Sequence, residues 1–144
     1  MTYPRVLVRG EENAGRLGMI ESVMPPGVAG PPLHKHDFDE AFYVIEGELT
    51  FQLEGELVEK GPGEHAFAPG GAPHTLTNRG SGPARYLLVC TPAGFEREFA
   101  RRAARKEGVE PPEWALGDIP LVTRLGPPIG EEATPPSGFD TSTG

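Results

Sequence analysis

Two separate stretches of the chain carry three histidines and one glutamate at spacings that would allow them to bind one metal ion. The first is HKHDFDE, residues 34–40, and the second is PHTLTN, residues 73–78. Three imidazoles and one carboxylate form a donor set that suits a divalent transition metal. Because four protein ligands leave positions free on a five- or six-coordinate ion, such a site favours reactivity over a purely structural role.

The geometry of the first stretch supports this interpretation. Alternate side chains of a β-strand share one face, so His34 and His36 point the same way, with Cα atoms about 6.6 Å apart. A bend at residues 37–39 would bring the Glu40 carboxylate over the same point, and folding would bring His74 from its distant segment. We therefore predict one divalent metal ion per chain, drawn from Fe, Mn, Ni, Cu and Zn, with four ligands: His34, His36, Glu40 and His74.

The spacing of these residues is also that of a known family, and the chain resembles the cupins. The first cupin motif is HxH, three or four residues, Glu, six residues and Gly, and it is matched by His34, His36, Glu40 and Gly47. The second is Gly, five residues, PxG, two residues, His, three residues and Asn, and it is matched by Gly63, Pro69, Gly71, His74 and Asn78. The resemblance covers roughly residues 15–91, with Val28 standing where the first motif usually has a glycine.

This resemblance implies both a fold and a chemistry. Cupins are small jelly-roll β-barrels that hold the metal inside the barrel. The segment DEAFYVIEGELTF, residues 39–51, is most similar to the single-domain, quercetin-dioxygenase-like branch. By that resemblance, Glu40 would be both a metal ligand and the acceptor of a proton from a substrate hydroxyl, which makes it the candidate catalytic residue.

Composition and charge agree with one all-β domain. A chain of 144 residues suits one domain with a hydrophobic core, and its 20 glycines and 17 prolines suit many short strands joined by tight turns. The net charge of −8 argues against a nucleic-acid partner. The N-terminal MTYPRVLVRG lacks the apolar core of a signal peptide, and no apolar run approaches a membrane span, so we expect a cytoplasmic protein. The single cysteine, Cys90, is expected to be a buried, unreactive thiol.

The barrel strands are predicted from alternating apolar and polar residues. They are residues 4–9, 15–24, 40–45, 48–53, 56–60, 65–68, 75–78 and 85–90. We expect 40–45 and 48–53 to pair as a hairpin with its turn at Glu46-Gly47. If Glu40 points into the barrel, then so do Phe42, Val44, Leu49, Phe51 and Leu53, whereas Thr50 and Gln52 face outward.

The C-terminal part of the chain is expected to be different. Thr91-Pro92 resembles an N-cap followed by proline at the first helical position, and residues 95–107 are predicted to form a helix that ends at Gly108. Phe95, Phe99 and Ala103 form an apolar stripe at helical spacing, which should pack on the barrel or across a subunit interface.

The predicted organisation has three parts. A cupin barrel spans residues 1–93, the helix spans 94–108, and an extended acidic tail rich in glycine and proline spans 109–144. The edge strand near the N-terminus and the apolar stripe of the helix together favour a homodimer.

Other residues have structural interpretations that compete with functional ones. His65 lies outside both motifs and is expected to be a strand residue with no catalytic role. Asp37 and Asp39 are expected in a solvated turn, and Asn78 is expected to form hydrogen bonds in a turn. Three phenylalanines either line a substrate cavity or pack in the core: Phe42, Phe51 and Phe67.

Three classes of function fit these residues. The first is a quercetin-dioxygenase-like oxygenase that acts on a small hydrophobic or aromatic hydroxy or keto compound. The second is a metal-dependent isomerase, lyase or cyclase without redox chemistry, and the third is a non-catalytic module that binds a small molecule. The complete ligand set favours an enzyme with a small-molecule substrate. No arginine cluster lies near the motifs in sequence, which disfavours a sugar phosphate.

Overall fold

A computed structural model describes residues 1–131 of the chain. Its strands are β1 (Arg5–Val8), β2 (Gly18–Met24), β3 (Leu33–Lys35), β4 (Asp39–Glu46), β5 (Leu49–Leu53), β6 (Glu56–Lys60), β7 (His65–Ala68), β8 (His74–Thr77), β9 (Ala84–Thr91) and β10 (Thr123–Gly126). Its helices are α1 (Glu96–Glu107) and two short 3-10 turns, η1 (Gly10–Glu12) and η2 (Glu113–Leu116). No helix within these 131 residues combines the length and the apolar character that crossing a bilayer requires.

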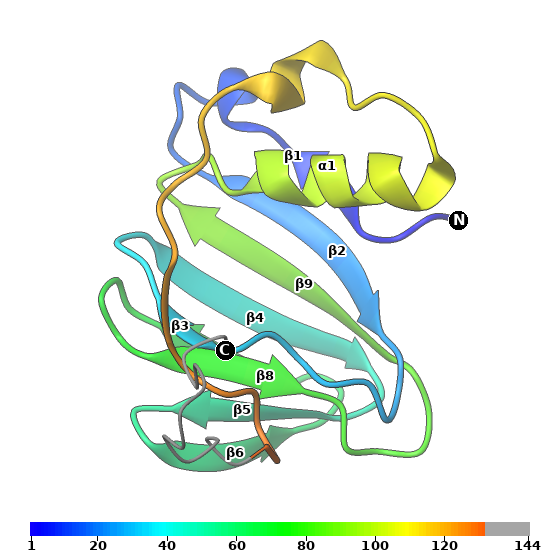
Figure 1. The fold of residues 1–144 in the computed structure, drawn as a ribbon, viewed down its shortest axis with the longest axis vertical. Coiled ribbons are helices and arrows are strands. Elements are labelled where there is room, and N and C mark those ends of the chain that lie inside the picture. Colours follow the sequence, from blue (N-terminus) through cyan, green and yellow to red (C-terminus); the bar gives the residue numbers. More distant parts are fainter. Residues whose placement is uncertain (132–144) are drawn as a thin grey trace, which may run out of the picture.

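The strands form two antiparallel sheets that face each other. The first sheet has the order β1-β2-β9-β4-β7, and the second has the order β10-β3-β8-β5-β6. Figure 1 shows the two sheets together with α1, which lies beside β1 and β2 at one end of the molecule. Strands that are distant in sequence, such as β2 and β9, are neighbours in the first sheet, as expected for a jelly roll. The predicted all-β jelly-roll fold with a C-terminal helix is confirmed.

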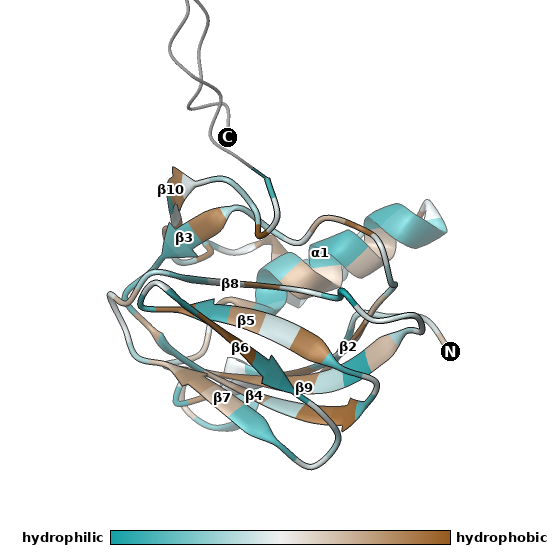
Figure 2. Cartoon of the chain, turned by 90° about the horizontal axis from the view of Figure 1, so that it is seen from below, coloured by the Kyte–Doolittle hydropathy of each residue, from teal (hydrophilic) through white to brown (hydrophobic). Residues whose placement is uncertain are grey.

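The core lies between the sheets because alternate residues of each strand point inward. Along β9, Tyr86, Leu88 and Cys90 are buried, and the residues between them are partly exposed. Figure 2, coloured by hydropathy, shows both hydrophobic and hydrophilic residues along strands such as β4 and β5. Burial raises the pKa of the Cys90 thiol, in agreement with the prediction of a buried, unreactive cysteine.

The predicted hairpin between residues 40–45 and 48–53 is wrong. β4 pairs with β7 and β9 in the first sheet, whereas β5 pairs with β6 and β8 in the second. The chain therefore crosses from one sheet to the other at Gly47, which adopts a φ of 76° and packs so closely against the start of β9 that a Cβ would meet Ala84. The tight hairpin is instead the next one, where Glu54 and Gly55 connect β5 to β6.

The inward residues of β5 agree with the alternation, but one outward residue differs. Leu49 and Phe51 are buried in the core as predicted. Thr50, which was expected to face outward, is also buried. It pairs in register with Thr77, whose hydroxyl donates to the carbonyl of Val28 at 3.4 Å in the loop after β2. That loop covers the outer face of the second sheet, which a two-residue pattern cannot reveal.

The prediction was correct for one end of helix α1 and wrong for the other. It ends as predicted, with Gly108 in the left-handed conformation at a φ of 68°. The predicted cap at Thr91-Pro92 is wrong, because Thr91 is the last residue of β9 and Phe95 occupies the N-cap position without a side-chain hydrogen bond. Phe95 and Phe99 are buried against the barrel, so the apolar stripe packs on its own chain.

A buried carboxylate anchors the first turn of α1. Glu96 is 1% exposed and accepts hydrogen bonds from the backbone N–H of Gly10 at 2.8 Å and of Gly94 at 2.6 Å. A Cβ on Gly18 would collide with the Glu96 side chain, so β2 and the helix approach each other only because this residue is glycine. From the sequence, Glu96 was expected only as an acidic residue early in the helix, where it suits the helix dipole, and its anchoring role was not predicted.

The segment after α1 contains a short turn and a strand that were not expected within the predicted extended tail. The turn η2 packs near the helix, with the guanidinium of Arg9 over the Trp114 ring at 5.0 Å. β10 then adds to the edge of the second sheet, where Arg124 pairs with His34. The division into residues 1–93, 94–108 and 109–144 stays a prediction, and the final part of the predicted tail, 132–144, lies outside the described residues.

The burial of Glu96 leads to a prediction about stability. Replacing Glu96 with alanine leaves two buried N–H groups without acceptors, and hydrogen bonds to charged groups contribute about 1.5–3 kcal/mol each. We expect Glu96→Ala to lower the free energy of unfolding by roughly 3 kcal/mol in a urea titration. Glu107→Ala, at an exposed position of the same helix, is the control and should change it by less than about 0.5 kcal/mol. Equal effects of the two substitutions would contradict the anchoring role.

Candidate metal centre

The structure brings the four predicted ligands together between the two sheets. We call them the His/Glu cluster: His34, His36, Glu40 and His74. Their potential ligand atoms all lie within 4.8 Å of one another. This is close to the span of about 4.2 Å between ligands on opposite sides of an ion with bonds of about 2.1 Å. The predicted convergence is thus confirmed, and the cluster can bind a metal.

Strand pairing explains how the cluster forms. His34 of β3 and His74 of β8 are opposite each other in the second sheet, and their ring centroids are 4.5 Å apart. His36 follows β3, and its ring stacks on Phe38 at 3.6 Å with parallel planes. Glu40 comes from β4 of the first sheet, so the cluster contains side chains from both sheets.

Small neighbours make room for the carboxylate of Glu40. In the first sheet its partners in register are Cys90 of β9 and Ala68 of β7, and both are fully buried. Residues directly opposite on adjacent strands share a face, so two small side chains flank the Glu40 carboxylate. Larger side chains at these positions would occupy space next to the ligand.

Backbone carbonyls determine which nitrogen of each histidine is free. The Nδ1 atoms lie at hydrogen-bonding distance from carbonyl oxygens: 2.7 Å for His34, 3.0 Å for His36 and 2.9 Å for His74. A carbonyl can only accept, so each Nδ1 carries the proton and donates it. A neutral imidazole in this tautomer has its lone pair on Nε2, which is the arrangement found in histidines that bind metals.

The free lone pairs face another acceptor. The Nε2 atoms of His36 and His74 lie 2.8 Å and 2.9 Å from the same oxygen, Oε1 of Glu40. A carboxylate and two lone pairs would repel one another, so a cation must lie between them, either shared protons or a metal. The donor set therefore fits a divalent transition metal.

The pKa shifts of Glu40 and His74 arise from the contact between the carboxylate and the imidazole. Burial alone would raise the pKa of Glu40, but hydrogen bonds from His36 and His74 outweigh it and hold the pKa below its usual value. Burial alone would lower the pKa of His74, but the Glu40 carboxylate outweighs it and raises the pKa. At His34 burial prevails and lowers the pKa. The Glu40 carboxylate and the His74 imidazole thus each stabilise the charged form of the other, and a divalent metal bound by the same atoms would compete with protons for them.

The cluster opens into a cavity of about 400 Å³ that is mostly apolar. Its lining includes His34, Glu40 and His74 together with Met24, Pro31, Phe42, Leu76, Tyr86, Leu88, Phe95, Phe99 and Arg102. Burial raises the pKa of Tyr86. Arg102 was not predicted from the sequence to line a cavity, although its position seven residues after Phe95 places it on the same helix face.

Residues outside the cluster fall into structural roles. His65 is exposed on β7, and Asp39 accepts a hydrogen bond from the backbone N–H of Gly70 at 2.7 Å. The side chain of Asn78 is buried and donates to two backbone carbonyls, as predicted for a turn residue. Of the three phenylalanines considered, Phe42 lines the cavity and packs in the core with Phe51. Phe67 is 52% exposed, so it is not a core residue, and it lines a different hollow from the one beside the cluster.

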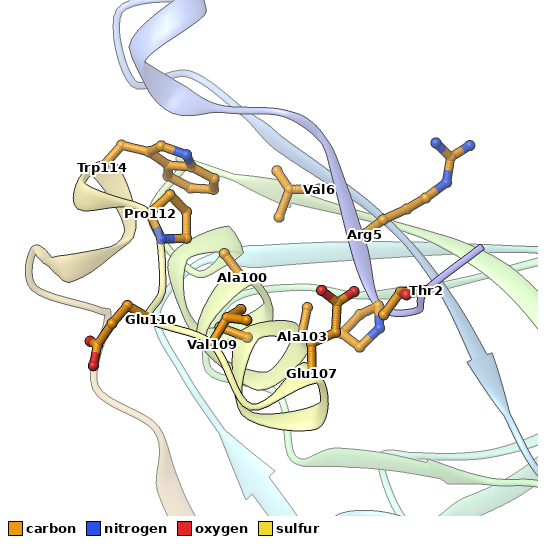
Figure 3. A pocket seen from close by; sticks show the side chains of 12 residues that line it. Thr2, Arg5, Val6, Ala100, Ala103, Glu107, Val109, Glu110, Pro112 and Trp114 are labelled. Carbon is orange, nitrogen blue, oxygen red and sulfur yellow. The ribbon is translucent and has the colours of Figure 1, made fainter.

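A second hollow borders another face of α1. It has a volume of about 320 Å³ and is lined by residues of β1, α1 and the segment up to η2, among them Val6, Ala103 and Trp114. Figure 3 shows these side chains around the opening between β1 and the end of the helix. Its lining contains no histidine, so the two faces of α1 border environments of different chemistry.

The first prediction from this geometry concerns metal content. His74→Ala and Glu40→Gln remove one ligand each, and a three-ligand remainder should hold a divalent ion far more weakly. We expect about one equivalent of metal per native chain and nearly none in either variant, measured by elemental analysis after gel filtration. His65→Ala is the control, since this histidine is exposed and outside the cluster. Full metal content in both ligand variants would refute the assignment.

A second prediction concerns β10. This strand pairs with the three-residue strand that carries His34, and the Leu33 N–H donates to the Pro127 carbonyl at 3.3 Å. A chain that ends at residue 121 lacks this support, whereas a chain that ends at residue 131 keeps every described element. We expect the shorter chain to bind Zn(II) about ten-fold more weakly in a competition titration, as is typical when the support of a ligand is lost. Equal affinities would show that β3 holds His34 without β10.

Proteins with similar sequences or similar structures are named for different activities. TcmJ, a tetracenomycin polyketide synthase protein of Streptomyces glaucescens, is 38% identical over 80 residues, which are 55% of this chain and 52% of that protein. The crystal structure of the polyketide cyclase RemF from Streptomyces resistomycificus is 31% identical with a TM-score of 0.54, over 60% of this chain and 62% of that one. The chain spans only 25–63% of the length of the curated relatives that it matches.

The family itself is identified by sequence and fold together. Residues 20–90 match the family described as "Cupin domain", and this range contains the whole His/Glu cluster. The crystal structure of TT1209 from Thermus thermophilus is 30% identical with a TM-score of 0.53, and the match covers 64% of this chain and 82% of that one. With two facing antiparallel sheets and both motifs in place, the chain belongs to the cupin superfamily.

Proposed function

We propose that the chain is a metal-dependent enzyme that acts on a small, mainly apolar compound with a hydroxy or keto oxygen. The observation that carries the proposal is the position of the His/Glu cluster in the wall of a largely apolar cavity. A cavity of this kind binds an apolar body, and its few polar groups determine the orientation.

The metal, Glu40 and the phenylalanines of the cavity would each have a different role in the reaction. A divalent metal bound by the cluster supplies a Lewis acid that polarises a hydroxy or keto oxygen. Glu40 is the proposed proton acceptor, because it is a buried carboxylate that lines the cavity, within reach of a hydroxyl bound there. Phe42 and Phe95 exclude water from this end of the cavity, which strengthens every electrostatic interaction there.

Two reaction classes are compatible with this site. We favour a non-redox reaction on a hydroxy or keto compound, such as a cyclisation, because similar proteins include a polyketide synthase protein and a polyketide cyclase. The second candidate is the quercetin-dioxygenase-like reaction predicted from the sequence. The donor set favours it in one respect, since three imidazoles and a carboxylate also suit Fe, Mn, Ni or Cu with positions open for oxygen.

We still propose a homodimer, but only one of the two features that suggested it, the edge strand, supports it. Phe95 and Phe99 are buried within their own chain and cannot form the interface. β1 still lies at the edge of the first sheet, and an unpaired strand edge is a common site of association between copies of a chain. Sedimentation of the native chain gives the oligomeric state directly.

The function is tested with the native chain purified without chelator or added metal. We expect about one divalent metal ion per chain by elemental analysis, and an absorbance shift when acetylacetone binds as its enolate to the metal-loaded protein. The shift should vanish after chelation and in Glu40→Gln.

For the favoured non-redox class, an oxygen electrode should show no oxygen uptake with diketones or flavonols; uptake would instead support the oxygenase. No metal in the purified protein, and none bound on titration, would overturn the proposed function.

A further inference from the structure

The cavity beside the His/Glu cluster contains a positive charge at its other end. Phe95, Phe99 and Arg102 line this cavity and are spaced four and three residues apart on α1, so they form one stripe of the helix. Phe95 marks the end near the cluster, with its ring centroid 6.2 Å from that of His36. With a rise of about 1.5 Å per residue, Arg102 is roughly 10 Å farther along the helix axis.

Arg102 is held in place by contacts that a ligand can replace. Its Nε donates to Glu98 at 2.8 Å, and its guanidinium lies 4.8 Å from the centroid of Phe99. The Arg102 side chain is 47% exposed, and exposed pairs of this spacing on a helix contribute only about 0.3–0.5 kcal/mol. The pair with Glu98 is therefore weak, and the guanidinium has further N–H donors for an incoming acceptor.

The other residues that line the cavity support the idea that the positive charge of Arg102 binds an anion. Among the described residues that line this cavity, Arg102 is the one with a permanent positive charge, and most of the others are apolar. The chain as a whole has a net charge of −8, which repels anions from its surface. An anionic group that entered the cavity would need a cation at the point where it comes to lie, and a guanidinium binds carboxylates in a two-pronged geometry.

We propose that Arg102 determines substrate specificity by binding an anionic group of the substrate. The substrate class is an apolar hydroxy or keto compound that carries a carboxylate, or another single negative charge, roughly 10 Å from the oxygens facing the His/Glu cluster. This inference rests on the proposed function, because it assigns the two ends of one substrate to the two ends of that cavity.

The test compares two probes on the native full-length chain. Flavonol has a hydroxy-keto pair at one end and an apolar phenyl ring at the other, and a derivative with a carboxylate on that ring adds the anionic group. Dissociation constants are measured by flavonol fluorescence with and without Zn(II). We expect the carboxylate derivative to bind about ten-fold more tightly than flavonol, which is the size of one hydrogen-bonded charge pair.

Two helix variants separate recognition from general charge. Arg102→Gln should remove the preference for the carboxylate probe and leave the affinity for flavonol within about two-fold, since only the anion loses its partner. Arg105→Gln is the matched control: Arg105 lies on the same helix and also contacts Glu98, at 3.4 Å, but does not line the cavity. It should keep the full preference. Arg102→Lys keeps the charge without the two-pronged geometry and should show an intermediate preference, which also serves if Arg102→Gln folds poorly.

The outcomes distinguish this inference from the proposed function. Equal binding of both probes by the native chain, or equal losses in Arg102→Gln and Arg105→Gln, would overturn the role of Arg102. Dependence of flavonol binding on Zn(II) would still support the metal site in that case. A carboxylate preference that needs Arg102 but persists without Zn(II) would support the inference and count against the metal-dependent function.

Discussion

Four electron-pair donors directed at one point constrain this structure more than any other feature. Each histidine of the cluster presents Nε2 because its Nδ1 donates to a backbone carbonyl, and Glu40 presents an oxygen. Such groups repel one another unless a cation lies between them. Since Glu40 belongs to the first sheet and His34 and His74 to the second, a bound metal ion would link the two sheets across the core. Metal affinity and barrel stability should therefore be coupled.

The orientation of α1 depends on a second buried polar group. Glu96 receives N–H donors from the chain before β2 and from the turn before the helix, so the first turn is tied to two places at once. An apolar residue could pack there, but it would not fix the rotation of the helix about its axis. Because that rotation is fixed, the stripe from Phe95 to Arg102 faces the cavity and a neighbouring face of the helix borders the second hollow.

The sequence was sufficient where local geometry decides the outcome and insufficient where distant contacts do. The two-residue spacing of His34 and His36 and the stop of α1 at Gly108 follow from strand and helix geometry, and both were predicted correctly. At Gly47, the glycine was expected to form a hairpin turn, but β4 pairs with β7 and β9 and β5 pairs with β6 and β8, so the two strands lie in different sheets. Glu96 and β10 were missed for the same reason, since their partners are Gly10 and β3.

The division of the cavity between two parts of the chain separates reactivity from selectivity. The His/Glu cluster lies within residues 20–90, the range that matches the cupin domain, so family membership informs the chemistry at that end. Phe95, Phe99 and Arg102 lie outside that range, on a helix whose anchoring depends on Glu96. The two ends of the cavity are thus formed by different parts of the chain, and a fold of this kind does not by itself determine what the second end admits.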